Sequence, residues 1–103
     1  RAALRDDHAL SDEACAALLD ELARMDHRVK VPQTSLAVLA LIRRWPKRPA
    51  GELADELGMD KSLFKRHVRR LKYRGLTESM TVGYRLSTRG ERLLAFAGER
   101  ANR

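Results

Sequence analysis

Residues 58–76 read GMDKSLFKRHVRRLKYRGL, and this stretch predicts a short helix with a marked beginning and a marked end. Asp60 is a residue type that caps helix N-termini, because its carboxylate can accept hydrogen bonds from the free amides of the first turn. Gly75 stands where a helix can end through a residue in the left-handed conformation. We therefore expect a helix over residues 61–74.

The expected helix has one apolar side, and its other faces are basic. Phe64, Val68 and Leu71 recur at four- and three-residue spacing, which places them on one face. The other faces carry basic side chains and no acid: Lys65, Arg66, Arg69, Arg70, Lys72 and Arg74. Charge runs on helices often simply face water, but such faces usually mix Glu with Lys, whereas these like charges repel one another. The pattern therefore favours contact with a polyanion.

A second short helix is expected immediately before this one, over residues 50–57. Gly58 ends it and the apolar Met59 leads into the basic helix, which is the spacing of a helix-turn-helix. Ala54 fits this interpretation, because a small side chain lets the two helices cross closely. The turn and the basic helix together predict a DNA-binding type of motif.

In the N-terminal part, Ser11 is an N-cap residue type and predicts a helix over residues 12–26. Its apolar stripe needs a cover, either from the rest of the fold or from the same helix of a second subunit, and the sequence leaves both open. The stripe consists of Cys15, Leu18, Leu19, Leu22 and Met25. The next helix is expected to open at Pro32, whose missing amide proton is not needed in a first turn, and to end at Trp45, a core residue.

The C-terminal part predicts a small two-stranded hairpin within residues 76–87, where Thr, Val and Tyr surround Gly83. A helical pattern resumes over residues 88–97. The expected fold class is thus mainly α with a small β-hairpin, a winged helix-turn-helix. We expect residues 1–30 to hold an N-terminal helix as a candidate dimerisation element, with no firm structure in residues 1–10. Residues 31–97 form the winged domain, and residues 98–103 are expected to be a loose tail.

Composition sets limits on function. The chain has 103 residues, enough for one domain, and a formal net charge of +7, which favours a polyanionic partner. It has no apolar run long enough to span a bilayer and no signal-peptide core, so we expect a cytoplasmic protein and no membrane partner. The single cysteine excludes an internal disulfide and a thiolate zinc cluster. No catalytic motif, cofactor-binding loop or metal-ligand spacing is present, so we expect neither an enzyme nor a cofactor or metal.

With the order helix, helix, basic helix, hairpin, helix in view, residues 35–94 resemble a winged helix-turn-helix domain. Three strings look like the MarR family of bacterial transcription regulators: ELADELG at 52–58, RLKYRGL at 70–76 and YRLSTRG at 84–90. ArsR-like, PadR-like and phage or plasmid winged-helix proteins share these strings. The resemblance implies sequence-specific binding of double-stranded DNA by a transcriptional regulator that acts as a homodimer; it does not identify an effector. The alternatives are a plasmid or phage replication or partition domain, and a winged-helix module for protein association.

The resemblance also implies roles for individual residues. With the 61–74 helix in the major groove, it places Ser62, Lys65 and Arg66 near base edges. It turns four other residues toward phosphates: Lys61, Arg69, Arg70 and Tyr73. Arg85 is the only cation of the hairpin and its nearest route to a phosphate. A typical MarR wing is longer and carries Asp and Arg near its tip, and the family dimerises through long terminal helices, so here the 12–26 helix is the main candidate for dimerisation.

Two further residues have competing interpretations. Some MarR-like regulators sense peroxide through one cysteine in the N-terminal helix, but Cys15 lies on an apolar stripe without an obvious basic neighbour, which favours a buried small hydrophobe. His67 lies between the apolar and basic faces of the 61–74 helix. We expect it to make a hydrogen bond in helix packing rather than to act as a pH switch.

Overall fold

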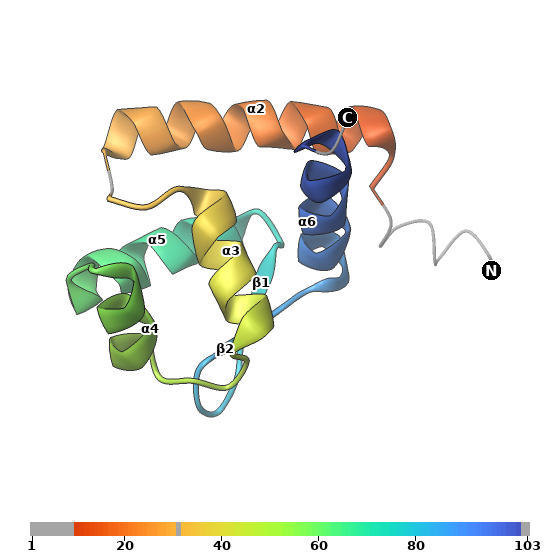
Figure 1. Cartoon of the computed structure of the whole chain (residues 1–103). Helices are drawn as coiled ribbons and strands as arrows, with labels where there is room; N and C mark the ends of the chain where they lie inside the picture. The colour runs from red at the N-terminus through yellow and green to blue at the C-terminus, as the bar shows by residue number, and fades with distance from the viewer. Residues whose placement is uncertain (1–9, 31, 102–103) are drawn as a thin grey trace.

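The computed structural model describes residues 10–30 and 32–101 (Figure 1). The expected fold class is confirmed: this part of the chain is mainly α with a small antiparallel hairpin wing. The expectation for residues 1–10 lies, apart from Leu10, outside the described residues. The elements in chain order are α2 (Asp12–Val29), α3 (Ser35–Arg44), α4 (Ala50–Leu57), α5 (Lys61–Tyr73), β1 (Thr77–Ser79), β2 (Tyr84–Leu86) and α6 (Thr88–Ala101).

The turn between α4 and α5 forms as its residues predict. Gly58 ends α4 in the left-handed conformation with φ of 67°. The amide of Met59 donates to the carbonyl of Ala54 (2.9 Å), and both side chains are buried. Asp60 caps α5, because its carboxylate accepts from the amide of Ser62 (2.9 Å). The helix-turn-helix is therefore held by backbone geometry and one capping carboxylate.

The end of α5 is also confirmed. Gly75 has φ of 76°, and its amide donates to the carbonyl of Lys72 (2.8 Å). The amide of Leu76 donates to the carbonyl of Leu71 (3.1 Å), which completes a Schellman motif. The chain leaves this cap directly into β1, so the cap sets the direction of the hairpin relative to α5.

The hairpin is attached to a segment that is distant in sequence. Strands β1 and β2 pair in the register Thr77 with Leu86 and Ser79 with Tyr84. The amide of Lys47, in the loop between α3 and α4, donates to the carbonyl of Tyr84 (3.0 Å). Next to it, Gly83 has φ of 77°, and an added Cβ would lie 2.2 Å from the carbonyl oxygen of Arg48. The α3–α4 loop therefore packs against the backbone of the hairpin.

The apolar stripe of α2 is covered within the chain. Figure 1 shows α2 lying across α6 and the N-terminal end of α3. Four stripe residues are buried: Cys15, Leu18, Leu22 and Met25. Leu19 is only half-buried. At one end of α2, Arg92 of α6 donates from Nη2 to Asp12 Oδ1 (2.6 Å) and from Nε to the carbonyl of Leu10 (3.0 Å). The sequence left open whether the rest of the fold or a second subunit covers this stripe. In the structure, the rest of the fold covers it.

Two predicted helix boundaries near the start of the domain are wrong. α3 begins at Ser35 and not at Pro32, because Thr34 provides the N-cap and its Oγ1 accepts from the amide of Ala37 (3.1 Å). α2 continues past residue 26 to Val29, where Lys30 follows in the left-handed conformation with φ of 53°.

The expectation of a loose tail is wrong for residues 98–101, because α6 continues to Ala101; residues 102–103 lie outside the described residues. The last turn of α6 makes a cation–π contact, because the guanidinium of Arg100 lies 5.7 Å from the ring centroid of Phe96. Trp45 is half-buried rather than fully enclosed, and Arg48 lies 5.5 Å from its ring centroid. Across the described ranges, no helix has the length and apolar character needed to cross a membrane.

Candidate nucleic-acid interface

The surface of α5 divides into one buried face and two exposed basic rows. At about 100° per residue, the buried face is a single sector. It consists of Phe64, His67, Val68 and Leu71. One basic row faces the hairpin and consists of Lys65, Arg69 and Lys72. The other lies on the opposite flank and consists of Arg66, Arg70 and Tyr73. Neither row contains an acid.

Most of the residues predicted to contact DNA share this surface. Arg70 is half-buried, whereas the others on α5 are exposed: Lys61, Ser62, Lys65, Arg66, Arg69 and Tyr73. Tyr73 has 90% of its surface exposed. The polar surface is thus continuous along the length of α5.

Arg85 is the predicted contact that the structure does not bring into this surface. It pairs across the hairpin with Glu78, and its Nε donates to Glu78 Oε1 (2.7 Å). Because successive residues of a strand point to opposite faces, this pair lies on the face of the hairpin away from Ser79 and Tyr84. The charge of Arg85 is therefore offset by a neighbouring acid, which the sequence alone could not show without the strand register.

A cleft of about 270 Å³ separates α5 from the hairpin. Its walls are formed by Lys65, Val68, Arg69, Lys72, Ser79 and Tyr84. Lys72 Nζ donates to Ser79 Oγ (3.2 Å) across it, and the ring of Tyr84 packs edge-on against Phe64 with centroids 6.1 Å apart. Three of these residues are not among the predicted DNA contacts: Lys72, Ser79 and Tyr84. Lys72 could have been found from its seven-residue spacing to Lys65, whereas Ser79 and Tyr84 require the hairpin register.

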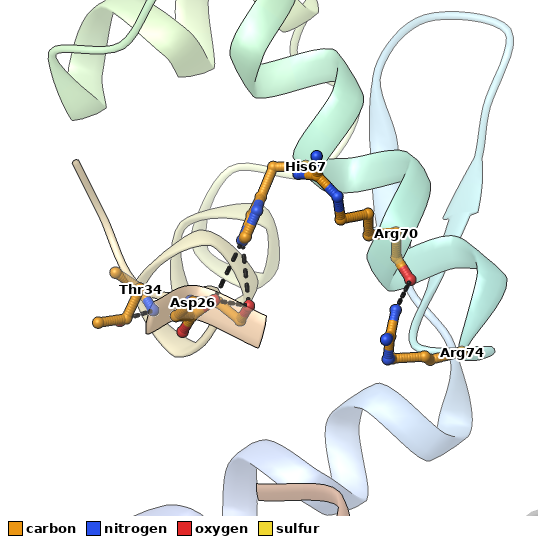
Figure 2. A network of polar contacts seen from close by, with 7 residues as sticks. Asp26, Thr34, His67, Arg70 and Arg74 are labelled. Carbon is orange, nitrogen blue, oxygen red and sulfur yellow. Dashed lines mark hydrogen bonds and ion pairs between the residues drawn. The ribbon is translucent and has the colours of Figure 1, made fainter. Parts of the chain in front are cut away.

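The opposite flank of α5 has a second hollow of about 270 Å³, formed by Arg66, Arg69, Arg70, Tyr73 and Arg74. Arg74 does not extend freely into solvent. Its Nε donates to the carboxylate of Glu21 on α2, and its Nη1 donates to the carbonyl of Arg70 (3.0 Å; Figure 2). The charge repulsion expected within α5 is thus relieved at its C-terminal end by an acid from another helix.

The tip of the hairpin gains cationic neighbours from the α3–α4 loop. A hollow of about 290 Å³ is formed by Lys47, Met80, Thr81 and Val82, and Val82 is 50% exposed. Lys47 is held here by the hydrogen bond that its backbone amide donates to the carbonyl of Tyr84, and Arg48 lies beside Gly83. The sequence placed no cation near the tip, because Lys47 and Arg48 precede the tip residues 80–82 by more than thirty positions.

A buried polar network fixes α5 to α2 and α3 (Figure 2). The hydroxyl of Ser35 donates to Asp26 Oδ1 (2.6 Å), and the amide of Ser35 donates to Asp26 Oδ2 (2.9 Å). The Asp26 carboxylate can only accept, so the Ser35 hydroxyl gives its single proton to Asp26. Ser35 Oγ can then only accept from its other neighbour, His67 Nε2, which lies 3.0 Å away. His67 is fully buried, so the expected packing hydrogen bond is confirmed.

The pKa of His67 is lowered, chiefly by burial, with Arg70 and Arg74 acting in the same direction and Asp26 opposing them. Its Nδ1 is buried without a hydrogen-bond partner among the described residues, so protonation there would place an unpaired donor in the core. The neutral ring is the form that this site accommodates.

Stability is expected to fall as the pH drops below about 6.5, the ordinary histidine pKa. The unfolded chain takes up a proton in this range and folded His67 does not, so its contribution is present above 6.5 and lost below, at up to about 1.4 kcal/mol per pH unit. His67→Gln keeps a donor for Ser35 and removes the titration. Urea unfolding between about pH 5 and 7 should give a steeper decline for the wild type than for this variant. Parallel profiles would contradict the assignment.

Cys15 is fully buried, and burial raises the pKa of its thiol, with the positive charge of Arg92 opposing. A raised pKa disfavours the reactive thiolate, so the environment supports the packing interpretation. In the described part of the chain, no three or more His, Cys, Asp or Glu side chains lie close enough together to hold a metal ion.

No protein-family model matches this sequence, and no curated protein matches it.

Proposed function

We propose that this domain binds double-stranded DNA in a sequence-specific manner through α5 in the major groove, and that it regulates transcription as a MarR-like protein. The observation that carries the proposal is the continuous acid-free basic surface of α5, presented by a capped helix-turn-helix. An α-helix with its side chains is about 10–12 Å wide, and the major groove is about 12 Å wide. Apart from the half-buried Arg70, the side chains of both basic rows are exposed, as groove entry requires.

Within this proposal, Ser62, Lys65 and Arg66 lie near base edges, because they occupy the N-terminal half of α5. Lys61, Arg69, Arg70 and Tyr73 lie toward phosphates. The main alternative within DNA binding is a replication or partition domain, which would use the same surface. Protein association is disfavoured, because the cores of protein interfaces are depleted in charged residues.

A homodimer on a two-fold DNA site stays a prediction. The four buried stripe residues cannot serve it without unfolding the chain, because α3 and α6 cover them. The half-buried stripe residue Leu19 remains available: with Ala23 and Leu36 it forms part of a hollow of about 400 Å³ where α2 meets the start of α3 and the end of α6. A two-fold interface would have to use such a surface.

Replacing Arg66 with alanine should weaken binding to a specific duplex by about 1–3 kcal/mol and relax the base preference at one position, because arginine bidentate to guanine is the commonest base contact. Arg69→Ala and Arg70→Ala should instead weaken binding equally on all sequences and reduce the salt slope by about 0.9 each. Fluorescence polarisation at several salt concentrations, on selected and random duplexes, measures both effects.

Arg24→Ala provides the control, since Arg24 is exposed on α2 and lies outside the α5 surface. It should leave both affinity and salt slope unchanged. If all three α5 variants bind duplex DNA with wild-type affinity, α5 is not part of the DNA interface. Absence of duplex binding by the wild-type chain would overturn the proposed function itself.

A further inference from the structure

The cleft between α5 and the hairpin concentrates positive charge. One wall carries the basic row Lys65, Arg69 and Lys72, and no acid lines the cleft. The hairpin acid, Glu78, lies on the other face of the strands and is paired with Arg85. The cleft therefore offers cations whose charge nothing in its own walls offsets.

The opposite wall offers hydroxyl donors. Ser79 Oγ accepts from Lys72 Nζ, which leaves the hydroxyl proton of Ser79 available to donate. Burial raises the pKa of the Tyr84 phenol, against the lowering effect of Arg69, so the phenol remains a neutral donor. A group that only accepts hydrogen bonds and carries negative charge matches such walls, and a phosphodiester is such a group.

The walls are held in place before any ligand arrives. Tyr84 packs on Phe64 in the core, and its carbonyl accepts from the amide of Lys47. Ser79 pairs with Tyr84 in the hairpin register and is linked to α5 by Lys72. A site that needs no rearrangement retains more of its interaction energy on binding.

We propose that this cleft holds one phosphate of the DNA backbone, contacted by Lys72, Ser79 and Tyr84 in addition to Lys65 and Arg69. This inference rests on the proposed function, since a helix in the major groove is flanked by the two phosphate backbones. A phosphodiester is favoured over an acidic peptide, because all residues that line the cleft except Val68 are basic or carry a hydroxyl group. The contact fixes the hairpin on the backbone beside α5 without using Arg85.

The test uses Lys72→Ala, Ser79→Ala and Tyr84→Phe in the full chain, with duplex affinity measured over a range of salt concentrations. Lys72→Ala should reduce the salt slope by about 0.9 and weaken specific and random duplexes equally. Tyr84→Phe removes one oxygen atom and keeps the aromatic packing, so it should weaken both duplexes by about tenfold without lowering the melting temperature. Arg24→Ala is the matched control for loss of a surface charge, and it should change neither quantity.

A titration with inorganic phosphate, followed by the backbone amide NMR signals of Ser79 and Tyr84, distinguishes binding of free phosphate from binding of a DNA backbone phosphate. We expect saturable shifts that are lost in Lys72→Ala, and the same shifts with duplex at far lower concentration. If the wild type binds duplex and the Lys72 and Tyr84 variants bind it equally well, the cleft contact is wrong and the proposed function stands. If the wild type binds phosphate but no duplex, both the proposed function and the backbone assignment are overturned.

Discussion

Alanine at position 83 will destabilise the domain by about 2–5 kcal/mol and release the hairpin from the α3–α4 loop. Two costs add. Gly83 has φ of 77°, where an L-residue costs about 1–2 kcal/mol. A Cβ there would also lie 2.2 Å from the carbonyl oxygen of Arg48 and 2.5 Å from its amide nitrogen. These are backbone atoms that cannot rotate away, so either the loop or the hairpin must move.

Two other glycines separate these costs. Gly58 has nearly the same conformation, with φ of 67°, but a Cβ would meet nothing within 4 Å, so Gly58→Ala should cost only the backbone strain. Gly98 lies in α6 with open space around it, and Gly98→Ala should stabilise the domain by about 0.5–1 kcal/mol. Urea unfolding of the three variants gives the comparison. Equal destabilisation at positions 83 and 58 would show that the loop does not anchor the hairpin.

The second large effect is expected at Leu22, which is 2% exposed on the face of α2 covered by the rest of the fold. Leu22→Asp removes about 2–3 kcal/mol of apolar burial and places a carboxylate in the core without a partner. A domain of this size has about 5–15 kcal/mol of stability in all. We expect a chain that is unfolded at 25 °C by circular dichroism, and not a folded monomer released from a dimer.

Ala17→Asp is the control, because Ala17 is exposed on the same helix. It should fold with a small loss of stability from helix propensity. Sedimentation of each variant with a circular dichroism spectrum distinguishes the two origins of the effect. A folded monomer from Leu22→Asp, beside a dimeric wild type, would show that the stripe belongs to an interface between subunits.

The parts of the fold that the sequence predicts well are those set by local chemistry. Gly58, Asp60 and Gly75 each act within a few residues of their own position, and α5 was placed within one residue of its observed end. The start of α3 was misplaced because two local signals compete there, the proline at 32 and the capping threonine at 34. Thr34 prevails because its hydroxyl satisfies an amide, whereas a proline only avoids having one.

The candidate site likewise has one part that follows from local sequence and one part that depends on strand register and tertiary packing. The exposed rows of α5 follow from helical periodicity, so the sequence predicts which side chains of that helix face outward. The pairing of Arg85 with Glu78 depends on strand register, and the position of Lys47 beside the hairpin depends on tertiary packing. Ser79 and Tyr84 were missed for the same reason, because neither is basic and only the fold brings them to Lys72.

The ion pair between Asp12 and Arg92 has a consequence for how the chain folds. It joins residues 80 positions apart, and it belongs to the packing of α2 on α6. Closing so long a loop carries an entropic cost that local contacts do not repay, and contacts of large sequence separation slow folding. The helix-turn-helix and hairpin can assemble from near neighbours, whereas α2 can complete its packing on α6 only after α6 has formed. In a chain made from its N-terminus, α2 is synthesised before the other described helices, yet it is among the last of them to complete its packing.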